Sequence, residues 1–144
     1  PNSIMDKKTA HVNVGDVLFV RVGVGSSGRA AVVIDKNDLG VADDWIYIIR
    51  LREKELMPYF LAIFMQTKYG KEQIEKMKRG VGTVTIPQAE LKKLLVPIPK
   101  KDFLKVVKEK YISMVQDLRT GNLIKAKEKF EEIVKNVEDY IFVL

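Results

Sequence analysis

Residues Tyr69–Pro99 have the sequence YGKEQIEKMKRGVGTVTIPQAELKKLLVPIP. This segment begins with a basic amphipathic stretch at 71–79, whose Ile and Met fall on one helical face. A glycine-rich turn follows, and then a Thr-Val-Thr-Ile run at 83–86 that predicts a strand. A second short apolar run at 95–98 ends in Pro-Ile-Pro and predicts another strand. The segment thus predicts a helix, a turn and two short strands that lead into the rest of the chain.

Positive charge is concentrated around this segment. Between Lys68 and Lys101, nine Lys and Arg stand against three Glu, an excess of +6 that equals the formal net charge of the whole chain. A basic patch beside a small-residue loop can hold a phosphate backbone and bring backbone amides close to it. Nucleic acid is therefore one candidate partner, and an anionic membrane surface or an acidic protein is another.

The composition limits the class of protein. With 144 residues and 47% hydrophobic content, the chain can bury one core. It has no cysteine, which excludes disulfides, a thiolate zinc site and a cysteine nucleophile. No apolar run reaches membrane-spanning length, and the N-terminus lacks the charged-then-apolar order of a signal peptide. We therefore expect a cytoplasmic protein without a membrane partner.

The residues before the basic segment follow a β pattern. Runs rich in β-branched and aromatic residues predict strands at 17–22, 30–34 and 45–51. Gly23–Gly28 matches G-x-G-x-x-G, but the third glycine leads into a β-branched run and not into the helix that a dinucleotide site requires. We therefore interpret it as a hairpin loop. A DNA contact through residues of this loop stays open, the candidates being Arg21, Ser26, Ser27 and Arg29.

Helices are predicted on both sides of the glycine turn. Pro58 is suited to the first turn of a helix, and the apolar residues after it predict a buried helix that ends at Gly70. The helix at 71–79 ends at Gly80, and a helical turn is expected at 90–94.

The residues after Pro99 predict two antiparallel helices. Apolar residues recur at spacings of 3 and 4, and Gly121 with Asn122 interrupts the register as a C-cap and tight turn would. Each apolar stripe could face the other helix, the β part or a second chain. We predict an α+β fold: a small mixed sheet with packed helices in residues 1–99, and a coiled-coil-like helical hairpin in 100–144. The expected spacer or dimer interface comprises Leu104, Val107, Tyr111, Met114, Leu118, Phe130, Ile133 and Val137.

Catalysis has little support in the sequence. His11 is the only histidine, the acids of the 35–44 loop lack metal-ligand spacing, and no common catalytic motif is present. We therefore expect neither a metal nor a cofactor. By contrast, Arg79–Thr85 offers glycine amides, threonine hydroxyls and an arginine suited to guanine. The first candidates for DNA contact are Lys78, Arg79, Gly80, Thr83 and Thr85, and the phosphate-contacting lysines are Lys68, Lys71 and Lys76.

The order of these segments resembles a known family. Val14–Gly23 (VGDVLFVRVG) and Gly28–Val33 (GRAAVV) resemble a conserved stretch of target-recognition domains. These domains belong to the specificity subunits of type I restriction-modification enzymes. The similarity continues through Pro58-Tyr-Phe-Leu, Tyr69-Gly, the Gly80–Ile86 turn and the Leu91–Pro99 run. It covers about residues 12–110. Two departures are Lys100–Leu104, where the family commonly has Glu-Gln, and the lack of a further N-terminal portion.

The resemblance implies a non-catalytic subunit that reads one half of a bipartite double-stranded DNA target. Its helices would set the distance to a second recognition domain, directing methyltransferase and restriction subunits to the DNA. A single recognition domain could pair its helices with a second copy as a twofold homodimer. The chain could be a half-subunit, a truncated subunit or the recognition domain of a fused enzyme. The competing hypotheses are a protein–protein scaffold that uses the coiled-coil face, and a nucleotide-dependent enzyme that uses the Gly23–Gly28 loop.

Overall fold

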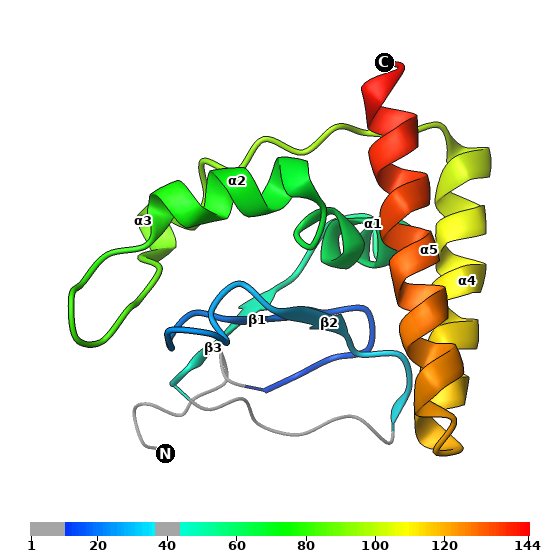
Figure 1. The fold of residues 1–144 in the computed structure, drawn as a ribbon, viewed down its shortest axis with the longest axis horizontal. Coiled ribbons are helices and arrows are strands. Elements are labelled where there is room, and N and C mark those ends of the chain that lie inside the picture. The colour runs from blue at the N-terminus through cyan, green and yellow to red at the C-terminus, as the bar shows by residue number, and fades with distance from the viewer. Residues whose placement is uncertain (1–10, 37–43) are drawn as a thin grey trace.

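The described chain folds as three strands followed by five helices (Figure 1). A computed structural model describes residues 11–36 and 44–144. In chain order the elements are β1 (Val17–Val20), β2 (Ala30–Val32), β3 (Ile46–Ile49), α1 (Met57–Phe64), α2 (Lys68–Met77), α3 (Gln88–Leu91), α4 (Lys101–Arg119) and α5 (Leu123–Phe142). The predicted α+β class is confirmed.

The strands form one sheet in the order β2-β1-β3. Both described pairings are antiparallel, with Leu18 opposite Ala31 on one side and Ile48 on the other. The predicted sheet was mixed, but the described sheet is antiparallel, because β2 and β3 each run opposite to β1, which lies between them. The three strands occur where predicted, with shorter bounds. Val17 and Phe19 are fully buried while the residues between and after them are half-buried, so one face of β1 carries the core.

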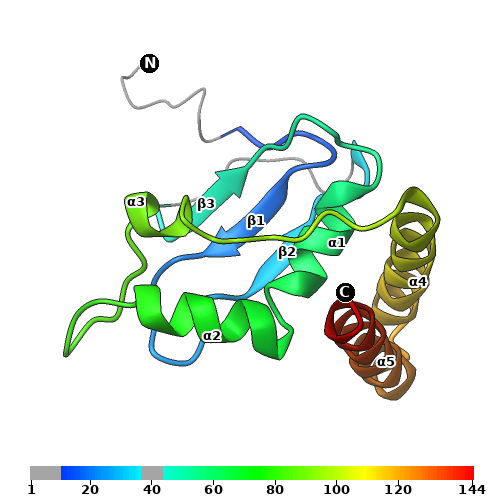
Figure 2. The same ribbon diagram turned by 90° about the horizontal axis from the view of Figure 1, so that it is seen from above.

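Helix α1 lies at the centre of the fold, in contact with β2, α4 and α5 (Figure 2). All residues from Pro58 to Phe64 are buried, as the uniformly apolar sequence predicts. The start of the helix is held by Glu53, whose carboxylate accepts hydrogen bonds of 2.8 Å from the backbone N–H groups of Leu56 and Met57. Desolvation would raise the pKa of Glu53, but these hydrogen bonds outweigh it and lower that pKa.

The prediction that Gly70 ends the first helix is wrong. The helix ends near Met65, and Thr67 caps the start of α2 with its side-chain oxygen, which accepts a 3.3 Å hydrogen bond from the Gly70 N–H. Gly70 lies inside the first turn of α2. A Cβ there would lie 2.2 Å from the carbonyl oxygen of Phe64, so this glycine allows the two helices to meet closely.

The predicted strands at 83–86 and 95–98 are not formed. The first run makes only isolated bridges, in which Thr85 pairs with Arg79 and with Val22. A full strand would need a longer partner than these bridges supply. The second run is irregular, and the Gln73 side chain bonds the backbone N–H and C=O of Leu95 (2.9 and 3.0 Å) in place of a neighbouring strand.

Helices α4 and α5 form the predicted antiparallel hairpin, joined at residues 120–122, where Gly121 adopts a φ of +81°. They pack on each other and on α1. The Tyr111 hydroxyl of α4 accepts a 3.1 Å hydrogen bond from the Val32 N–H at the end of β2. Residues before and after Pro99 therefore share one hydrophobic core.

The apolar stripes of the hairpin face inward. Of the residues predicted as a spacer or dimer interface, Leu104, Val107, Tyr111, Met114, Ile133 and Val137 are buried and Phe130 is half-buried. Leu118 alone among them is 49% exposed. The apolar stripes could have faced the other helix, the β part or a second chain. In the structure they face the other helix and the rest of the same chain.

Candidate nucleic-acid interface

Two loops that lie far apart in the sequence meet at one end of the molecule. Gly23 donates its backbone N–H to the Val84 carbonyl (2.9 Å), and Ile86 donates to the Arg21 carbonyl (2.8 Å). The end of β1 and the hairpin loop 23–28 are thereby joined to the loop 79–85. In Figures 1 and 2 the loop between α2 and α3 lies on the side of the molecule away from α4 and α5. Both sets of predicted DNA contacts thus belong to one region.

Arg21 is held in place where the two loops join. Its Nε donates to the Asp44 carbonyl oxygen (2.6 Å) and its Nη1 to the Thr85 hydroxyl oxygen (3.3 Å). The guanidinium carbon lies 5.5 Å from the centroid of the Tyr47 ring, within cation–π range. A guanidinium fixed by three neighbours has already lost much of its conformational freedom, which favours a specific contact over a diffuse one.

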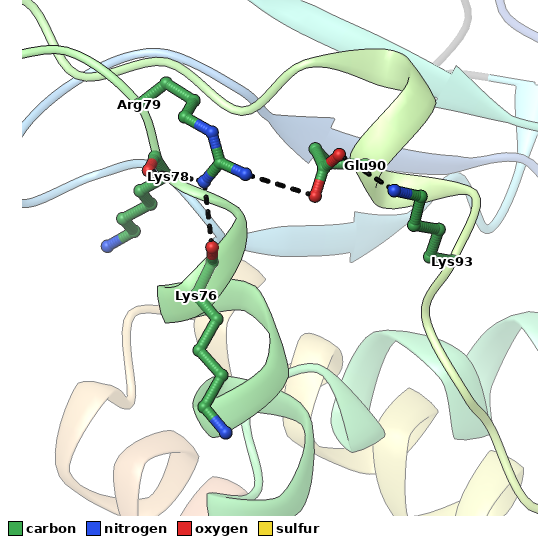
Figure 3. Close-up of polar contacts among 5 residues, drawn as sticks. All are labelled: Lys76, Lys78, Arg79, Glu90 and Lys93. Atoms are coloured by element: carbon green, nitrogen blue, oxygen red, sulfur yellow. Dashed lines mark hydrogen bonds and ion pairs between the residues drawn. The ribbon is translucent and has the colours of Figure 1, made fainter.

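Arg79 is folded back onto the protein (Figure 3). Its Nη1 donates to the carbonyl oxygens of Lys76 (2.9 Å) and Lys78 (3.0 Å), and its Nη2 pairs with Glu90 at 3.3 Å. Glu90 also pairs with Lys93 at 3.1 Å. The Arg79 side chain is 52% exposed, so this ion pair is a weak, solvent-screened contact that a ligand can replace.

The turn after Arg79 depends on glycine. Gly80 has a φ of +106°, and a Cβ at this position would lie 2.2 Å from the Thr83 carbonyl oxygen. Thr83 is exposed, whereas Thr85 is half-buried against Arg21. The loop therefore presents backbone and a threonine hydroxyl to solvent.

The hairpin loop contributes three candidate residues with different surroundings. The Ser26 hydroxyl donates to the Val22 carbonyl oxygen (3.3 Å), within the hairpin itself. Ser27 is 8% exposed, and its Oγ has no hydrogen-bond partner among the described residues. Arg29 is exposed. Gly23 and Gly28 have positive φ and connect two strands, so no helix begins at this loop as a dinucleotide site would require.

The candidate lysines are spread along α2. Lys78 is the most sheltered, with 20% of its side chain exposed and a 2.9 Å ion pair to Glu75. Lys76 is 78% exposed beside Glu72, and Lys71 is also exposed. Lys68 lies at the opposite end of the helix, about 15 Å from Lys78 along the axis. Its backbone N–H bonds Glu138 of α5 (2.7 Å), so it is separated from the two loops.

Most of the partners that position these groups are not apparent from the sequence. Tyr47 lies beneath Arg21, Glu90 holds Arg79, and Glu75 holds Lys78. Only the Glu75–Lys78 spacing, i and i+3 on one helix, is a signal that the sequence offers. The other two partners depend on the tertiary fold.

No group of three or more His, Asp or Glu that could hold a metal ion occurs in 11–36 and 44–144. His11 is exposed. Of the acids in the 35–44 loop, Asp38 and Asp43 lie outside the described residues. Within the described part of the chain, no helix is both long enough and apolar enough to cross a membrane.

No protein-family model matches the chain, and a search among curated proteins returns no similar sequence.

Proposed function

We propose that this chain is a DNA target-recognition module, the non-catalytic specificity component of a type I restriction-modification system. It would act in the cytoplasm and read one half of a bipartite duplex target. The observation that carries this proposal is the backbone pairing of residues 21–23 with 84–86. This pairing joins the loops 23–28 and 79–85, which supply arginine, serine, threonine and glycine amides, next to the lysines of α2.

In this proposal the two arginines read bases. Arg79 exchanges its surface pair with Glu90 for a bidentate contact to guanine, and Arg21 approaches from the junction of the loops. Thr83 adds a hydroxyl, while Lys71, Lys76 and Lys78 contact phosphates and account for most of the salt dependence.

The helical hairpin serves as the spacer in the same proposal. It lies away from the 79–85 loop and would dock the methyltransferase and restriction subunits (Figure 1). Because most of its apolar stripe is buried within the chain, a second copy would have to meet another surface. Leu118, Leu123 and Ile124, at and near the α4–α5 turn, are between 49% and 77% exposed and offer one.

Selection of bound duplexes from a random pool tests the function directly. The wild-type chain should enrich a short motif, and Arg79→Ala should lose the preference at one or two positions of that motif. The proposal is refuted if neither the isolated chain nor the chain assembled with a methyltransferase subunit enriches a motif.

A further inference from the structure

A cavity of about 300 Å³ lies between the hairpin loop and α2. The sequence does not predict this cavity, because the hairpin loop and α2 are separated by some forty residues and meet only in the fold. Its walls come from the hairpin, from the end of α1 and from α2, and its lining residues are Gly25, Ser27, Gly28, Arg29, Met65, Gln66, Lys71, Ile74, Glu75 and Lys78.

One face of α2 forms a wall of this cavity. Lys71, Ile74, Glu75 and Lys78 are spaced at i, i+3, i+4 and i+7, which places all four on the same side of the helix. Ile74 is buried and gives this wall an apolar base. Lys71 lies within α2 and Lys78 is its C-cap residue, so the two lysines are about two helical turns apart, at either end of the wall.

The hairpin loop is fixed against α2, so the cavity has a defined shape. The Gln66 side chain donates a 3.0 Å hydrogen bond to the Gly28 carbonyl oxygen. Gly28 adopts a φ of +97°, and a Cβ there would lie 3.4 Å from Ile74, which shows how closely the loop approaches the helix. The Gly28 N–H in turn bonds the Val20 carbonyl at the end of β1 (2.7 Å).

The charges around the cavity favour an anion. Three cationic side chains line it, Arg29, Lys71 and Lys78, against the single carboxylate of Glu75. Across residues 11–36 and 44–144, no acid pairs with Arg29 or Lys71, and the only ion pair at the site is Lys78–Glu75 at 2.9 Å. Ser27 adds a buried hydroxyl without a partner among these residues, and a buried donor of this kind gains from an acceptor.

We propose that this cavity is a binding site for one phosphate group of a nucleic-acid backbone. The proposal rests on the proposed DNA-binding function and deepens it. An arginine fork, two ammonium groups and a hydroxyl match the non-bridging oxygens of a phosphodiester. Phosphate entry draws Lys78 away from Glu75. Because the hairpin is joined to the 79–85 loop through the backbone, a phosphate held here fixes the register in which that loop meets the bases.

The test combines two probes with single charge changes. Amide NMR spectra of the full chain are recorded with inorganic phosphate and, separately, with a short mixed-sequence duplex. Duplex affinity is measured across salt concentrations for Lys71→Ala, Glu75→Gln and Lys127→Ala. Lys127 lies exposed on α5 and serves as the matched control for the loss of one lysine charge. All three residues are exposed, so these variants should fold.

Both probes should shift amides of residues 27–29 and 71–78. Lys71→Ala should weaken duplex binding about tenfold and reduce the salt slope by about one, while Glu75→Gln tightens binding and Lys127→Ala changes little.

The failures of the two proposals differ. If the duplex binds but Lys71→Ala behaves like Lys127→Ala and the cavity amides do not shift, the phosphate site is refuted and the DNA-binding function stands. If inorganic phosphate shifts the cavity amides but no duplex binds, both the nucleic-acid ligand and the proposed function are refuted. Displacement of inorganic phosphate from the cavity by poly-glutamate but not by the duplex would overturn the assignment to a nucleic-acid phosphate in favour of an acidic protein.

Discussion

Replacing Gly70 by alanine should destabilise the protein, against the usual preference of helices for alanine. The added Cβ would lie 2.2 Å from the Phe64 carbonyl oxygen and 2.9 Å from the Met65 Cα. Both are backbone atoms that cannot rotate away, so the start of α2 must move by about 1 Å to reach ordinary contact distance. Overpacking costs about 1–3 kcal/mol, and because both clashing atoms belong to the backbone we take the upper end of that range. Helix propensity returns up to about 1 kcal/mol, which leaves a net loss of about 2 kcal/mol.

Urea and thermal unfolding followed by circular dichroism measure this loss. A net 2 kcal/mol corresponds to a fall in Tm of about 4–8 °C for a chain of this size. Gly82→Ala is the matched control, because a Cβ at Gly82 meets nothing within 4 Å. A Gly70→Ala variant that is as stable as wild type, or more stable, would show that α1 and α2 do not meet as described.

Three further predictions concern the helix start, the interface and the core. Glu53→Ala should lose about 1 kcal/mol at neutral pH; because the folded pKa is lowered from its ordinary 4.5, unfolding curves of the two proteins should converge as pH falls through that lowered value. Glu90→Gln should raise duplex affinity about two- to fivefold in fluorescence anisotropy, since it removes a negative charge and the ion pair of the Arg79 Nη2 group, and unchanged binding would refute that role. Tyr111→Phe should cost about 1–3 kcal/mol in urea unfolding because it leaves the buried Val32 N–H without an acceptor, and a neutral effect would contradict this hydrogen bond.

Local patterns were sufficient to predict most of the fold. Runs of β-branched and aromatic residues predict the three strands, apolar residues at spacings of 3 and 4 predict the helical hairpin, and Gly121 marks the hairpin turn where expected. Gly70 shows the limit of such signals. A glycine in a helical stretch can end a helix or let another backbone approach, and only the position of Phe64 decides between these roles.

The candidate site was less predictable. The residue types at 21–29 and 79–85 indicated two separate candidate loops. The contact between these loops depends on backbone hydrogen bonds between 21–23 and 84–86, which no local sequence pattern encodes. Residues 83–86 do not form a strand because only isolated bridges, Thr85 with Val22 and with Arg79, pair their backbone with the rest of the chain. Ion-pair partners such as Glu90 likewise follow from the fold.

Mapping photo-crosslinks between the chain and a duplex by mass spectrometry tests directly whether one end of the molecule holds DNA. We expect crosslinked peptides from 21–29 and from 71–85, with α4 and α5 free of them. Crosslinks confined to α4 and α5, or none under conditions where a control DNA-binding protein crosslinks, would contradict this expectation.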